Sequence, residues 1–197
     1  MLGFNDMTPL FVTIQKNIKD DFHLLDINQI EPWVFFNSGK PMRVKKHDGK
    51  QISYEGGGFE GSPQDVFWGK YIEPFIEEIA VKQVNSAVEL SKSKNINGVN
   101  VLKEAEMLLY GEISKVFSKM AKIEQRLLGK GYPEKVKARD VQPYISASSE
   151  FVKALVQSEI SMWSTKPWYE LWYEKNKFII WAAGVFLTMV GLYAKFK

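Results

Sequence analysis

The sequence predicts a mainly α-helical protein, α+β in class, with a small β-hairpin near residues 33–55 and one C-terminal transmembrane helix. Three observations support this fold class. Apolar residues recur every three or four positions along several stretches, which is typical of amphipathic helices. An Asp-Gly pair lies between two stretches of alternating side chains, which favours a hairpin. A long uncharged stretch near the C-terminus is typical of a membrane span.

The composition fits one globular domain and a local apolar segment. Of the 197 residues, 45% are hydrophobic and 25% charged, and there is no cysteine. The lack of cysteine excludes disulfides, thiolate zinc sites and cysteine nucleophiles. The net charge of +3 does not favour a nucleic-acid partner, and two basic clusters are interpreted as solvated surface. The clusters are Lys40, Arg43, Lys45, Lys46 and Lys50, and Lys130, Lys135, Lys137 and Arg139.

The N-terminal part is predicted to form a short amphipathic helix and then a small sheet. The candidate cap Asp6 and the breaker Pro9 mark the start of the helix. Its apolar positions are Phe4, Leu10, Phe11, Ile14 and Ile18. The sheet is expected between residues 33 and 55, around a turn at Asp48-Gly49 in which both central positions favour positive φ. The glycine-rich segment 56–61 lacks the Lys-Ser/Thr of a P-loop and is interpreted as a linker.

Two long helices should follow and pack as an antiparallel pair across the turn at residues 95–98. The first is expected to start at Ser62-Pro63 and to kink at Pro74. Its apolar positions are Phe67, Tyr71, Phe75, Ile79, Val84 and Val88. The second has a nearly heptad spacing, with apolar residues at Leu102, Ala105, Leu109, Ile113, Val116, Met120, Ile123 and Leu127.

The glycines at 129 and 131 are expected to end the second long helix. A third helix is predicted after them, and Pro167 should end it. Its apolar residues are Phe151, Val152, Leu155, Val156 and Ile160. The domain organisation is therefore a soluble helical domain at 1–164, an aromatic and basic interfacial segment at 165–177, and a transmembrane anchor at 178–194.

The predicted anchor contains no charged residue over its seventeen positions, which span roughly 25 Å as a helix. The residues expected to face lipid are Phe178, Trp181, Phe186, Leu187, Val190 and Tyr193. The residues expected at the interfaces are Trp168, Trp172, Tyr173, Lys175, Lys177, Lys195 and Lys197. Gly184, Thr188 and Gly191 share one helix face and are candidates for close helix packing. A buried core helix would need neither flanking lysines nor aromatic residues at both ends.

The orientation follows from the position of this stretch. Only three residues follow it, and no early segment has the order of a signal peptide, because charges interrupt residues 11–30. We therefore expect a tail-anchored protein whose soluble domain lies in the cytosol.

No catalytic, cofactor-binding or metal-binding residue is assigned from the sequence. His23 and His47 are the only histidines, and neither has a partner at a metal-ligand spacing. His47 precedes Asp48, but adjacent residues of a hairpin point to opposite faces, so the pair is interpreted as turn chemistry. An enzyme is the less favoured class, although residues from distant loops could still assemble a site.

Three functions remain open at this point. The first is a non-enzymatic interaction or assembly module held at the lipid bilayer, which binds a protein partner or itself. The second is a membrane-perturbing effector, of the pore-forming or defence kind, that oligomerisation activates. The third is a membrane-bound enzyme without a recognisable motif. No cofactor and no small-molecule substrate are inferred.

Overall fold

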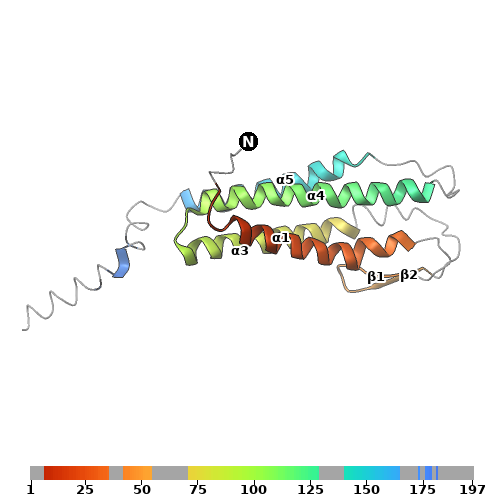
Figure 1. The fold of residues 1–197 in the computed structure, drawn as a ribbon, viewed down its shortest axis with the longest axis horizontal. Helices are drawn as coiled ribbons and strands as arrows, with labels where there is room; N and C mark the ends of the chain where they lie inside the picture. The colour runs from red at the N-terminus through yellow and green to blue at the C-terminus, as the bar shows by residue number, and fades with distance from the viewer. Residues whose placement is uncertain are drawn as a thin grey trace, which may run out of the picture. The chain divides into compact units, whose positions relative to one another are not determined.

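The computed structural model describes residues 7–35, 42–54, 71–128 and 140–164, together with 173, 176–178 and 181. The described part is mainly helical, as predicted, and has one two-stranded sheet. The chain divides into two compact units, Met1–Ser158 and Glu159–Lys197. In the first unit, α1 (Phe11–Leu25) packs against α3 (Glu73–Lys94) and α4 (Gly98–Leu128), and the hairpin lies beside the end of α1 (Figure 1).

The first helix, α1 (Phe11–Leu25), confirms the amphipathic helix predicted at the N-terminus. The Phe11 N–H donates to the Thr8 carbonyl at 3.0 Å, which closes the turn that contains Pro9. The proposed cap Asp6 lies outside the described residues. The buried stripe of α1 consists of Ile14, Ile18, Phe22 and Leu25.

The helical path continues beyond α1 as a π-helix, η2 (Asp26–Ile30), and a 3₁₀ helix, η3 (Glu31–Phe35). The prediction that the sheet starts at residue 33 is therefore wrong for Trp33–Phe35. Pro32 lies in the first turn of η3, where its fixed φ suits a helix and its missing N–H costs nothing. Trp33 is buried and meets the edge of Tyr71 at a ring distance of 6.2 Å. Burial of this ring outweighs the strand preference of the local sequence.

The predicted hairpin is confirmed by β1 (Met42–Lys45) and β2 (Gln51–Tyr54), which pair antiparallel with Lys45 opposite Gln51. Met42 and Val44 are buried, whereas the intervening basic residues are exposed. The turn type differs from the prediction, since only Gly49 has positive φ, at 84°. Lys46 donates to the Lys50 carbonyl at 2.7 Å and closes a three-residue loop, so one left-handed residue suffices.

Helix α3 (Glu73–Lys94) confirms the helix predicted there, although the proposed start at 62–63 lies outside the described residues. Pro74 falls in its first turn and does not kink it, which corrects the prediction. Tyr71, Val84 and Val88 are buried as expected, but Phe75 and Ile79 are half-buried. The buried residues within α3 are Ile76, Ala80, Gln83, Val84, Ala87, Val88 and Ser91.

The turn after α3 is built around Asn95, whose φ of 53° is left-handed. Asn95 donates to the Lys92 carbonyl at 3.2 Å and Ile96 to the Ser91 carbonyl at 3.0 Å, which is the Schellman pattern. The Asn97 side chain then accepts from the Val99 N–H at 3.0 Å and caps α4 (Gly98–Leu128). The predicted antiparallel pairing of α3 and α4 is confirmed (Figure 1).

Helix α4 supplies the largest buried stripe, and every predicted apolar position from Leu102 to Ile123 is buried. The side chain of Leu127 lies outside the described residues. Helix α5 (Gln142–Ser164) matches the third predicted helix and buries Val152 and Val156. Tyr144 of α5 stacks on Phe117 of α4 at a ring distance of 5.8 Å, which joins the two helices.

Candidate functional site

Asp21 joins α1 to α3. Its Oδ1 lies 2.7 Å from the Lys82 ammonium, and its Oδ2 accepts from the Gln83 amide at 2.6 Å. The Asp21 side chain is largely shielded from solvent, so these two contacts replace its hydration. The carboxylate therefore holds two helices together.

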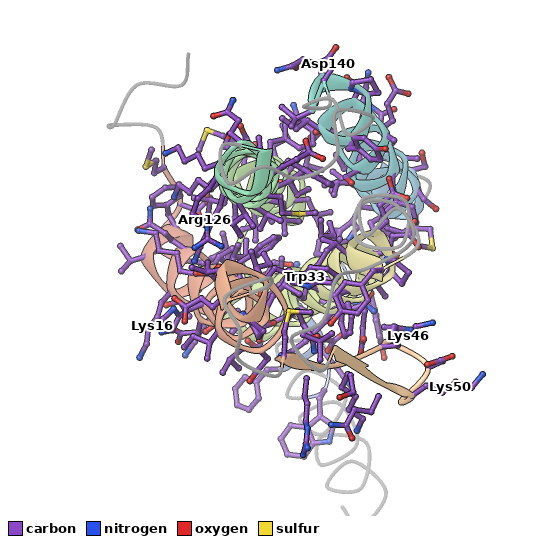
Figure 2. All side chains as sticks on the ribbon, turned by 90° about the vertical axis from the view of Figure 1, so that its right-hand side faces the viewer. Lys16, Trp33, Lys46, Lys50, Arg126 and Asp140 are labelled. Atoms are coloured by element: carbon purple, nitrogen blue, oxygen red, sulfur yellow. The ribbon has the colours of Figure 1, made fainter. Side chains whose placement is uncertain are left out.

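Helix α4 holds η2 and η3 by two basic side chains. The Lys119 ammonium lies 2.6 Å from Asp26 Oδ2 and 3.6 Å from Glu31 Oε1. About two turns further along α4, Arg126 donates to the Val34 carbonyl, and it extends from α4 toward η3 in Figure 2. The Arg126 bond satisfies a backbone acceptor at the end of η3, where the helix itself supplies no donor.

Glu104 is the most buried carboxylate with a described partner, at 3% exposure. It accepts from the Thr8 N–H at 2.5 Å and from the Thr8 hydroxyl at 2.6 Å. Two charge-assisted hydrogen bonds to one residue fasten the start of the chain to α4. Glu104 thus acts as a structural acceptor.

An open groove of about 240 Å³ lies between α1, η2 and α3, and we call it the interhelical groove. Its lining residues are Asp21, Leu24, Leu25, Asn28, Gln29, Phe75, Glu78, Ile79 and Lys82. Leu24 is 56% exposed, and the neighbouring Ile27 is 44% exposed. An apolar centre with a charged rim is the composition of protein-binding surfaces.

A second hollow, of about 570 Å³, adjoins the interhelical groove because both are lined by Asn28 and Gln29. We call it the basic hollow; its other lining residues are Arg43, Val44, Lys45, Gly49 and Gln51. Arg43 and Lys45 are exposed, which agrees with the interpretation of the basic cluster as solvated surface. Lys46 and Lys50 project from the outer end of the hairpin (Figure 2), whereas Arg43 and Lys45 border this hollow.

The structure separates the two members of the His47-Asp48 pair. His47 Nε2 lies 2.8 Å from Glu78 Oε2, and its ring meets the edge of Phe75 at 5.2 Å. Asp48 instead accepts from the Lys50 N–H at 3.0 Å, and this bond holds the pKa of the Asp48 carboxyl below its usual value. The interpretation as turn chemistry agrees with this geometry. Within the described residues, no three histidine or acidic side chains are placed to share a metal ion.

No family model, curated protein or solved structure matches this chain. The function is therefore inferred from the residues and geometry of the chain itself. Of the surface residues described above, Leu24, Ile27, Asn28 and Gln29 were not singled out from the sequence. The only sequence feature that could have marked this surface is that Leu24 and Ile27 are apolar but lie off the buried stripe of α1.

Few of the predicted anchor and interfacial residues are described. Phe178 and Trp181 are exposed, and their ring centroids lie 6.1 Å apart; Tyr173 and Lys177 are exposed as well. The other predicted residues lie outside the described part: Trp168, Trp172, Lys175, Gly184, Phe186, Leu187, Thr188, Val190, Gly191, Tyr193, Lys195 and Lys197. Among the described residues, no helix has both the length and the apolarity that a membrane crossing requires.

Proposed function

We propose that this chain is a non-enzymatic interaction module that a C-terminal membrane helix tethers to a lipid bilayer. The observation that carries the tether is the uncharged stretch at 178–194, with lysines and aromatic residues at both ends. Each part of this pattern has a separate physical reason: apolar length to cross the hydrocarbon, aromatic rings for the interface, and lysines for the headgroups. The exposed, adjacent rings of Phe178 and Trp181 agree with a lipid-facing surface.

The interhelical groove supports the interaction part of the proposal. Leu24 and Ile27 are three positions apart at the end of the α1 and η2 path, and both expose large apolar side chains. Asp21, Glu78 and Lys82 line the groove together with Leu24 and supply both signs of charge. A protein partner would bury the apolar area and find charged partners at the rim, which is how specific interfaces are organised.

The roles of the charged residues in the first unit also support a binding module. Asp21 and Asp26 each bind a side chain of a neighbouring helix, and Glu104 binds Thr8 ahead of α1, so their charges contribute to the architecture. A rigid helical scaffold that leaves an apolar area exposed suits the display of a binding surface.

The tether can be tested in the full-length protein. Leu187→Arg with Val190→Arg places two charges near the middle of the proposed span, where each costs about 3 kcal/mol of insertion free energy. We expect the protein to move from the carbonate-resistant membrane pellet to the supernatant. Val12→Arg with Val81→Arg is the matched control, because both valines are exposed on helices of the first unit. If the anchor variant stays in the pellet, the proposed tether is wrong.

Partner binding can be tested by site-specific photo-crosslinking in membranes of the cells that make the protein. A crosslinker at Leu24 or Ile27 should yield a discrete adduct with a second protein, because Leu24 lines the groove and the exposed Ile27 lies three positions further along the same helical path. A crosslinker at Val12, which is also exposed on α1, is the control. Adducts of the same size and yield at all three positions, or no adduct at any, would argue against the groove as a binding surface.

A further inference from the structure

The basic hollow has the features of a site for a small anion. It is bordered by η2 on one side and by the hairpin on the other, and its volume of about 570 Å³ is within the range of ligand pockets. Arg43 and Lys45 supply two positive charges, and Asn28, Gln29 and Gln51 supply carboxamides. Among the lining residues that the structure describes, there is no carboxylate.

Among the described residues, the two cations have no ion-pair partner that would compete for a ligand. Neither the Arg43 guanidinium nor the Lys45 ammonium forms an ion pair within the described part of the chain. Their positions in β1 follow from the strand alternation, because Met42 and Val44 face the core and the residues between them face outward. The alternation that buries Met42 and Val44 therefore places both positive charges on the exposed face of β1.

Tyr71 connects two residues that line the basic hollow, Gln29 and Lys45. Its hydroxyl donates to Gln29 Oε1 and lies 3.2 Å from the Lys45 carbonyl oxygen, so one residue ties η2 to β1. Because the Gln29 oxygen accepts from Tyr71, its amide nitrogen is the end that remains to donate. Tyr71 is itself buried against Trp33, which restrains this arrangement.

We propose that the basic hollow binds a phosphate-bearing anion through Arg43 and Lys45, with the carboxamides of Asn28, Gln29 and Gln51 as further donors. Guanidinium and carboxamide groups can each offer N–H donors to phosphate oxygens, and a guanidinium can bind two oxygens at once. The phosphate can belong to a lipid headgroup or to a soluble compound, since both present the same oxygens. The proposal does not depend on the membrane tether.

The test uses the full-length protein in a neutral detergent and isothermal titration calorimetry. One probe is inositol 1,4,5-trisphosphate, which is soluble, and the other is dioctanoyl phosphatidylinositol 4,5-bisphosphate, which carries a similar headgroup on short acyl chains. We expect saturable binding of at least one probe below about 1 mM. Binding of both indicates that phosphate groups suffice, and binding of the lipid alone indicates a headgroup site. No saturable binding of either probe would overturn the proposal.

Two double variants with equal loss of charge separate this site from general attraction to a basic protein. Arg43→Gln with Lys45→Gln should weaken binding by about tenfold or more, because charge-assisted hydrogen bonds are lost. Lys46→Gln with Lys50→Gln should change it by less than about threefold, since these lysines lie at the tip of the hairpin (Figure 2) and contribute only screened attraction. Equal weakening by the two variants would contradict the proposal.

A third variant covers the case in which the Arg43 and Lys45 substitutions disturb the hairpin. Gln51→Glu retains the shape of the side chain and places a negative charge in the basic hollow. Circular dichroism and thermal unfolding should show an intact fold, while probe binding weakens by about tenfold. Unchanged probe affinity in a folded Gln51→Glu protein would also overturn the assignment.

Discussion

Alanine substitution at two glycines should change stability in opposite directions. Gly49 has a φ of 84°, where a side chain costs about 1–2 kcal/mol of backbone energy. A Cβ at Gly49 would meet only Lys45 Cε at 3.9 Å, an ordinary contact, so steric overlap adds nothing. Gly111 lies within α4, and a Cβ there would meet nothing within 4 Å. Gly49→Ala should therefore destabilise the domain by about 1–2 kcal/mol, and Gly111→Ala should stabilise it by about 0.5–1 kcal/mol.

The assay is urea unfolding of the full-length protein in neutral detergent, followed by far-ultraviolet circular dichroism. Two further variants at Gly49 test the cause: Gly49→Asn should cost less than Gly49→Ala, because asparagine tolerates left-handed φ, and Gly49→Val should cost at least as much as Gly49→Ala. A Gly49→Ala protein as stable as the wild type would refute the turn geometry. A loss of stability in Gly111→Ala would refute the open environment on α4.

Three other changes test separate parts of the structure. Glu104→Gln should lower the free energy of unfolding by about 1–3 kcal/mol in urea titrations, because an amide NH₂ would then face the donors of Thr8; an unchanged midpoint would contradict the buried contact. Burial and the nearby Glu77 raise the pKa of Glu73, so wild-type stability should fall as pH rises from 4.5 through that raised pKa. Glu73→Gln should remove this fall, which unfolding curves at several pH values would show. Deletion of residues 165–197 should give a protein that stays in the supernatant with a helical spectrum; sedimentation with membranes after a high-salt wash would indicate another anchor.

The long helices could be predicted because their burial is one-sided and regular. In α4 the apolar spacing from Leu102 to Ile123 coincides with the buried face, since each side of this helix has one environment along its length. In α3 the apolar spacing predicts burial of Phe75 and Ile79, but the buried residues are their neighbours Ile76 and Ala80. Phe75 and Ile79 border the interhelical groove and are half-buried. Apolar residues at a binding surface follow the same spacing as core residues, so the sequence alone does not separate them.

The hairpin could be located from the sequence, but its loop length could not be deduced. Asp48-Gly49 is compatible with a two-residue turn and with a three-residue loop. The choice depends on which residues close the ladder, and here Lys46 bonds Lys50 while Val44 is fixed by burial in the core. The core thus determines the register, and the loop adapts to it.

The two surfaces proposed to bind ligands share Asn28 and Gln29, which lie in the π-helix η2. No periodic signal marks these residues, because the change from α to π geometry shifts side chains away from the α-helical spacing. Single-turn π segments inside helices often occur at functional sites. Here η2 turns two polar side chains toward both hollows, while Ile30 remains fully buried and Asp26 is bound by Lys119. The local distortion is therefore held in place from α4. Asn28 and Gln29 line both the basic hollow and the interhelical groove, where Asn28 is exposed and Gln29 is already held through its oxygen by Tyr71.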